Sequence, residues 1–148
     1  MKQNFTAFPM LLVPVFLYAI LATFSGSGGV DHAAPMANML GQAWFQLTMV
    51  SGDPWVFDLG DAVLLLGLVM LFIEVTRSTG TQTVSMINHG LSLAVFIAAL
   101  IAFLLLRNYG TSEFFFLLMM LLLDVVSGFV VTISAARRDF GVASGALD

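Results

Sequence analysis

The sequence predicts an all-α, polytopic membrane protein: four transmembrane helices in an antiparallel bundle, with a short outer interfacial segment. Hydrophobic residues make up 59% of the chain, charged residues only 9%, and the mean hydropathy is +1.00. A soluble domain carries about 25% charged residues. The apolar residues also form long runs without the polar positions that a soluble helix or strand would show. Membrane strands are not expected, because open sheet edges are not tolerated in lipid and no alternating ten-residue pattern appears.

Four apolar runs are long enough to cross about 30 Å of hydrocarbon, which takes about 20 helical residues. We therefore expect one membrane domain over residues 1–148, with helices at about 7–24, 54–76, 84–106 and 113–135. Short polar connections predict that helices 54–76 and 84–106 are antiparallel neighbours, as are helices 84–106 and 113–135. Asp53 and Pro54 suit the N-cap and the first position of the second helix.

The basic residues predict the orientation. With the N-terminus inside, the cytoplasmic side carries four of them: Lys2, Arg77, Arg137 and Arg138. Only Arg107 is then outside, which agrees with the positive-inside rule. We expect a bacterial inner-membrane protein with both termini in the cytoplasm. The first apolar run is longer than the usual 7–15 residues of a signal peptide core, which favours an uncleaved helix.

The outer segment 25–53 is the only sizeable part outside the predicted helices. Six apolar residues recur in it at helical spacing: Met36, Met39, Leu40, Ala43, Leu47 and Val50. Two interpretations stay open, a short helix lying in the outer interface and a loop packed over the bundle. A segment of about 29 residues is too short for an independent catalytic domain.

Asp124 lies near the middle of the predicted helix 113–135. An Asp at the centre of a spanning helix costs about 2.5–3.5 kcal/mol on insertion scales, so it needs a partner or a proton. Asp124 is therefore either a proton or cation site, or a neutral carboxyl that hydrogen-bonds across helices and fixes their register.

His89 is the best candidate partner for Asp124. Counted from the helix ends, Asp124 lies about 9 Å deeper than His89, so contact requires helix tilt or a bridging water. Asn88 is adjacent in sequence but points about 100° away around the helix. An interface position without a ligand role remains the alternative for His89.

Two further carboxylates lie near the ends of helix 54–76. Glu74 precedes Arg77 by three positions, and a local ion pair at the cytoplasmic end explains both residues. Asp61 falls in the first outer turn, where a carboxylate suits a helix N-terminus or could line an outer cation vestibule. By depth, Glu74, His89 and Asp124 could form a proton path that Asp61 continues outward.

Small residues recur every four positions along helix 84–106, at Gly90, Ala94, Ala98 and Ala102. Such a stripe allows another helix backbone to approach closely. Gly60 and Gly67 of helix 54–76 could face it inside the bundle, and a partner interface is the alternative.

Residues 84–92, 124–129 and 135–141 (Val-Ser-Met-Ile-Asn-His-Gly-Leu-Ser, Asp-Val-Val-Ser-Gly-Phe and Ala-Ala-Arg-Arg-Asp-Phe-Gly) resemble small four-span inner-membrane proteins of bacteria. This resemblance covers about half of the chain in its second part. It implies a location in the inner membrane and carries over no functional residue.

The composition excludes several function classes. With no cysteine, and with His32 and His89 on opposite sides of the predicted membrane, we expect no metal site, no haem and no other cofactor. Five Lys and Arg residues are too few for nucleic-acid binding, and no nucleophile–base pair of an enzyme can be placed. We expect a non-enzymatic accessory or structural subunit of a larger inner-membrane complex, in contact with lipid and with other subunits or copies of itself. The alternative is a small homo-oligomeric proton- or cation-linked transporter or channel.

Overall fold

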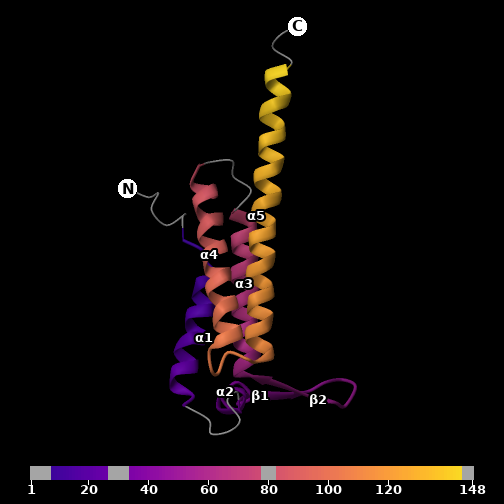
Figure 1. The fold of residues 1–148 in the computed structure, drawn as a ribbon. Helices are drawn as coiled ribbons and strands as arrows, with labels where there is room; N and C mark the ends of the chain where they lie inside the picture. Colours follow the sequence, from indigo (N-terminus) through magenta and orange to yellow (C-terminus); the bar gives the residue numbers. More distant parts are fainter. Residues whose placement is uncertain (1–7, 27–33, 78–82, 145–148) are drawn as a thin grey trace, which may run out of the picture.

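The computed structural model describes residues 8–26, 34–77 and 83–144. Its elements, in chain order, are α1 (Leu12–Phe24), α2 (Ala34–Leu40), β1 (Ala43–Thr48), β2 (Pro54–Asp58), α3 (Leu59–Arg77), α4 (Thr83–Leu105) and α5 (Ser112–Ser144). The bundle consists of α1, α3, α4 and α5, which run side by side, and β1 and β2 form a hairpin across one end of it (Figure 1). We call this end the hairpin end.

Three described helices are long and apolar enough to cross a membrane, namely Leu59–Arg77, Asn88–Leu105 and Ser112–Val130. The chain is therefore a multi-pass membrane protein, as its composition predicts. The fourth predicted span is represented by α1, an apolar helix of 13 residues that is shorter than a full crossing. Pro14 lies in its first turn, where the missing N–H removes no helical hydrogen bond.

The central helix of the bundle is α5, which packs against α4, α3 and α1. Its buried positions follow a helical stripe: Phe114, Leu117, Leu118, Leu121, Asp124, Val125 and Gly128. At 33 residues it is longer than the predicted helix 113–135, and beyond the bundle it continues alone towards the C-terminus (Figure 1). Because α5 takes the central place, α3 and α4 each pack mainly against α5. Helices α3 and α4 meet directly at the Asn88–Glu74 hydrogen bond, but their main packing partner is α5.

The region between α1 and α3 departs most from the sequence prediction. The helix expected from Met36 to Val50 is present only over α2 (Ala34–Leu40). Residues 43–58 form an antiparallel hairpin, so the next span begins at Leu59 and the fold is not all-α. Asp53 lies in the turn and Pro54 begins β2; they are not the N-cap and first residue of a helix. A hairpin is tolerated because it lies outside the spans, where water can reach its free edges.

The start of α3 is set by Asp58 and Asp61. The Asp61 backbone N–H donates to Asp58 Oδ1 at 2.8 Å, and the Asp58 N–H donates to Asp61 Oδ2 at 3.3 Å. This reciprocal capping satisfies two backbone donors at the helix N-terminus. It also joins β2 to α3 without an intervening loop, which fixes the hairpin to the bundle.

The small residues predicted to face each other do not do so. Gly60 and Gly67 face α5, where an added Cβ at Gly67 would lie 2.7 Å from Leu117 Cδ2. Gly90, Ala94 and Ala98 are exposed on the outside of α4, and Ala102 is only partly buried. The inner face of α4 instead carries the small residues Ser92 and Ala99, which are buried, beside larger apolar residues that are partly buried.

Candidate intramembrane polar site

Asp124 is fully buried on the inner face of α5. It lies three residues after Leu121 and seven after Leu117, so all three side chains are on the same side of the helix. Leu121 and Val125 are also buried, so apolar side chains flank the carboxyl along its own helix. A carboxyl in such surroundings needs a polar neighbour from another helix.

The neighbours of Asp124 come from α4. Ser92, which is fully buried, lies near the Asp124 carboxyl, and His89 acts on that carboxyl electrostatically. Gly128, one helical turn after Asp124, leaves the space in which the His89 ring lies, since a Cβ at Gly128 would collide with that ring. The packing of α4 on α5 thus brings His89 and Asp124 together, although depth counted from the helix ends separates them.

The oxygen atoms around Asp124 are poorly satisfied. No described residue completes a hydrogen bond to either carboxyl oxygen of Asp124, and the same holds for Ser92 Oγ and Asn88 Oδ1. The Ser92 hydroxyl faces Asp124 but does not reach hydrogen-bonding geometry. Buried polar groups are usually paired, so such a group is where a protein can take up a proton, a water or an ion.

Glu74 is also buried, with 2% of its surface exposed. Its Oε2 accepts the backbone N–H groups of Met10 at 2.5 Å and Leu11 at 3.2 Å, and its Oε1 accepts Asn88 Nδ2 at 2.8 Å. The carboxylate therefore caps the N-terminus of α1 from α3, where the helix dipole favours negative charge. The predicted ion pair with the exposed Arg77 does not explain Glu74, because its acceptors are directed to α1 and α4.

Asn88 and His89 make α4 the bridge between the two carboxyls. Consecutive residues point about 100° apart on a helix, so Asn88 donates to Glu74 on α3 while His89 lies against α5. Asp124 and Glu74 also interact electrostatically. We call these five residues, Glu74, Asn88, His89, Ser92 and Asp124, the carboxyl cluster.

Asp61 is not part of the carboxyl cluster. It lies at the opposite end of α3 from Glu74, about 20 Å away at 1.5 Å rise per residue. Its carboxylate is occupied by the capping interaction with Asp58. Asp61 is therefore too far from Glu74 to continue a proton path from the carboxyl cluster directly.

A second polar cluster, which was not predicted from the sequence, lies at the hairpin end. The Tyr18 hydroxyl donates to the Asn108 carbonyl at 2.9 Å and shares a 2.6 Å hydrogen bond with the Thr111 hydroxyl. The Asn108 amide donates to the carbonyls of Ala22 at 3.2 Å and Gly26 at 2.9 Å, at the C-terminus of α1. We call Tyr18, Asn108 and Thr111 the tyrosine cluster.

The backbone of the tyrosine cluster has an unusual conformation at Asn108. Asn108 has φ 67°, a left-handed conformation that Asn tolerates better than most residues. The neighbouring Tyr109 ring packs 4.9 Å from that of Phe114, and burial raises the pKa of the Tyr109 hydroxyl. Two features of the sequence could have indicated this cluster: a Tyr inside the first apolar run, and the polar connection Asn-Tyr-Gly-Thr at residues 108–111.

The described residues contain no group of three His, Asp or Glu side chains arranged to hold a metal ion. The carboxyl cluster has one acidic group without a hydrogen-bond donor among the described residues, one satisfied carboxylate and one imidazole. Carboxyl and imidazole groups are among the side chains that act as proton donors and acceptors in proteins.

Comparison with known proteins gives no relative. No family model matches the chain, and no match is found among curated proteins or solved structures.

Proposed function

We propose that this chain is a small proton-linked membrane protein, of the transporter or channel class, in which Asp124 binds and releases the proton. One observation carries the proposal: Asp124 is fully buried between helices, and no described residue gives its oxygens a hydrogen bond. Ionisable residues inside membrane helices are costly and often mark ion or proton pathways.

His89 supports a proton rather than a metal ion as the ligand of Asp124. An imidazolium can give its proton to an Asp124 oxygen, which leaves a neutral imidazole beside a neutral carboxylic acid and conserves the total charge. The imidazole of His89 can both donate and accept a proton. Its contact with Gly128 places it one helical turn from Asp124.

Glu74 has a positioning role in this proposal. Its three hydrogen bonds tie α1, α3 and α4 together, and its charge acts on Asp124 across the cluster. A proton on one carboxyl then makes a proton on the other less favourable, since like charges within a buried site avoid coexisting.

The proposed topology has four spans, with α1 as the fourth crossing and both termini in the cytoplasm of a bacterial inner membrane. Its support is the distribution of basic residues. In this orientation the carboxyl cluster lies on the cytoplasmic half of the bundle and the hairpin on the outer side.

The experiment is proton flux into liposomes that contain the purified protein and a trapped pH-sensitive dye. After a pH jump, the wild type is expected to carry protons across the membrane, and Asp124→Asn is expected to reduce the rate to that of empty liposomes. Asp61→Asn makes the same chemical change outside the cluster and is expected to keep the flux. Equal flux in wild type and Asp124→Asn contradicts the proposal.

A second candidate function is an accessory subunit of a larger inner-membrane complex. It is favoured by the outer face of α4, where Gly90, Ala94 and Ala98 are exposed and an added Cβ at Gly90 meets no atom within 4 Å. Such a face allows a helix of another subunit to approach closely.

Purification of the tagged chain from gently solubilised membranes, at native expression, tests this candidate. Larger membrane subunits should be recovered in stoichiometric amounts with the wild type and lost with Ala94→Leu combined with Ala98→Leu. Ile97→Leu combined with Ile101→Leu keeps the side-chain volume on a neighbouring exposed strip and should keep the complex. Recovery of the chain alone contradicts the accessory role.

A further inference from the structure

The pairing register of the hairpin places aromatic side chains together on one face. Phe45 pairs with Phe57 and Leu47 pairs with Trp55, so these four side chains share one face. The stacked Phe45 and Phe57 rings are 5.0 Å apart, and the Trp55 ring meets both edge-on. We call Phe45, Leu47, Trp55 and Phe57 the aromatic face; Gln46, Thr48, Pro54 and Val56 form the opposite face.

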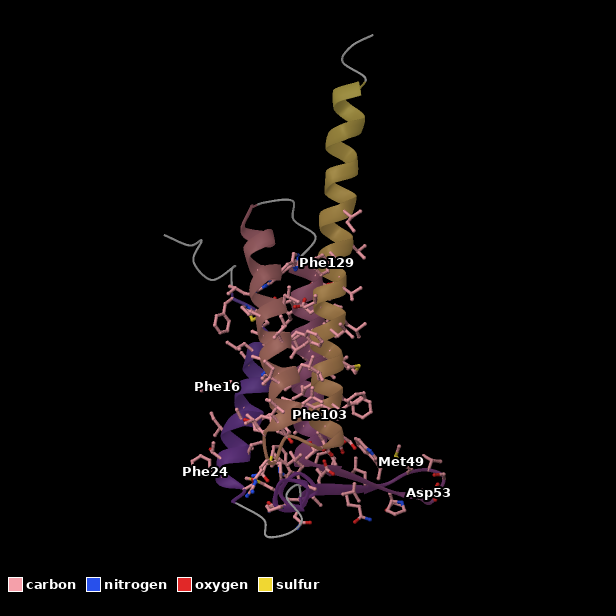
Figure 2. The ribbon with its side chains drawn as sticks, viewed as in Figure 1. Phe16, Phe24, Met49, Asp53, Phe103 and Phe129 are labelled. Atoms are coloured by element: carbon pink, nitrogen blue, oxygen red, sulfur yellow. The ribbon has the colours of Figure 1, made fainter. Side chains whose placement is uncertain are left out.

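The aromatic face is largely uncovered. Phe45 is 46% exposed, Leu47 52% and Trp55 44%. The hairpin meets the helices through the end of β2, which leads into α3, and its remaining length extends sideways from the bundle (Figure 1). Met49 and Asp53 mark its far end, well away from the helices (Figure 2).

The hairpin runs crosswise to the helices, so it lies parallel to the plane of a membrane that the helices cross (Figure 1). Capping by Asp58 and Asp61 joins it directly to the first turn of the span Leu59–Arg77. Its depth is therefore that of the membrane boundary.

We infer that the hairpin lies in the interface of the bilayer at its hairpin end, with the aromatic face against the acyl chains next to the headgroups. Two requirements lead to this location. The free edges of a two-stranded sheet expose backbone N–H and C=O groups, which need water and exclude the hydrocarbon core. The exposed aromatic rings need an apolar surrounding, and Trp and Tyr are enriched at membrane–water boundaries.

The partner is the lipid itself and not a charged headgroup in particular. Between Ala43 and Phe57 the only charged residue is Asp53, at the exposed turn, and there is no Lys or Arg. Attraction to anionic lipids requires basic residues. Zwitterionic lipid should therefore suffice, and added salt should not release the hairpin.

The location of the hairpin can be tested directly, because the two tryptophans of the chain both belong to it: Trp44 lies on β1 and Trp55 on β2. Tryptophan emission of the wild-type protein thus reports on the hairpin alone. The protein is reconstituted into phosphatidylcholine liposomes whose acyl chains carry bromine at either a shallow or a deep position. Iodide added outside and inside the liposomes probes access from water.

Interfacial placement predicts emission at shorter wavelength than that of the unfolded chain, quenching by shallow bromine that exceeds quenching by deep bromine, and weak quenching by iodide. Strong iodide quenching without bromine quenching places the hairpin in water and overturns the inference. Protection from both quenchers shows that protein covers the face, a second copy or another subunit, and overturns it as well.

A pair of variants links the signal to the aromatic face. Phe45→Ser combined with Leu47→Ser should shift the emission to longer wavelength and increase iodide quenching, since both side chains are removed from that face. Gln46→Ser combined with Thr48→Ser changes the opposite face of the same strand and should leave the spectrum unchanged. Equal effects of the two variants contradict the assignment of the lipid-facing side.

Discussion

Two buried polar clusters join the helices of the described bundle, and they differ in how completely their polar atoms are paired. In the tyrosine cluster, the Tyr18 hydroxyl, the Thr111 hydroxyl and the Asn108 amide nitrogen all have protein partners; only Asn108 Oδ1 lacks one among the described residues. In the carboxyl cluster, the described residues leave both Asp124 oxygens without a hydrogen bond. A buried polar group that serves structure alone is usually satisfied, so the difference distinguishes a structural network from a site for a ligand.

The largest expected effect separates function from stability at Asp124. Replacement by Asn should abolish proton flux while the protein remains folded, because Asp124 makes no hydrogen bond to a described residue that the change would break. Asn has nearly the size and shape of Asp and is neutral, so the change neither opens a cavity nor buries a charge. Flux in liposomes and the unfolding midpoint in a denaturing-detergent titration measure the two quantities. A large loss of stability would instead make Asp124 a structural residue.

Glu74 should show the opposite pattern. Glu74→Leu removes the acceptor of Asn88 and of two backbone N–H groups just before α1, and each buried group left unsatisfied costs about 1–3 kcal/mol. We expect a clear fall in the free energy of unfolding, measured in the same titration. Arg77→Gln is the matched control, and it should leave stability unchanged because Arg77 is exposed. Equal losses in the two variants would restore the ion-pair interpretation.

Gly128 tests whether His89 is held where the proposal needs it. A methyl group at Gly128 meets the His89 ring directly, whereas at Gly90 it meets nothing within 4 Å. Gly128→Ala should therefore lower the free energy of unfolding by about 1–3 kcal/mol, as overpacking does, and should reduce proton flux. Gly90→Ala introduces the same methyl group into α4, where it should raise the free energy of unfolding by up to about 1 kcal/mol through helix propensity and leave proton flux unchanged. An undisturbed Gly128→Ala protein would contradict the contact.

The smallest effect is expected in the tyrosine cluster. Tyr18→Phe removes one hydroxyl and its two hydrogen bonds, which should lower the free energy of unfolding by about 1 kcal/mol. Proton flux should stay at the wild-type rate, because both hydrogen bonds of the Tyr18 hydroxyl go to Asn108 and Thr111, outside the carboxyl cluster. Thermal unfolding followed by circular dichroism and the liposome assay provide the two readings. Loss of flux in a stable Tyr18→Phe protein would remove the distinction between the clusters.

The sequence predicts the apolar helices well because hydrophobic length is a local property. It also identifies Asp124, since a carboxylate in a long apolar run is conspicuous. The role of Glu74 was missed because its partners Met10 and Leu11 are more than 60 positions away. A signal existed nonetheless, since Gly60, Gly67 and Glu74 are spaced by seven residues and therefore share a face of α3.

The hairpin was not predicted, for a different reason. Leu47 and Val50 fit a helical stripe by spacing alone, but Trp, Phe and Val on either side of Ser51-Gly52-Asp53 are typical of strands joined by a turn. Gly52 has φ 93°, a conformation that favours glycine. The turn residues Ser51, Gly52 and Asp53 determine the local structure here, and the helical spacing of apolar residues does not. Their sequence is typical of a turn between two strands.

Proton binding at Asp124 can be measured directly by infrared difference spectroscopy of the reconstituted protein during a pH titration. The chain has nine Asp and Glu residues, so acidification should produce several overlapping protonated-carboxyl bands. One component of the wild-type difference spectrum should be missing from Asp124→Asn but present in Asp61→Asn. Identical difference spectra for the wild type and Asp124→Asn across the titration would show that Asp124 does not exchange a proton, and would contradict the proposed function.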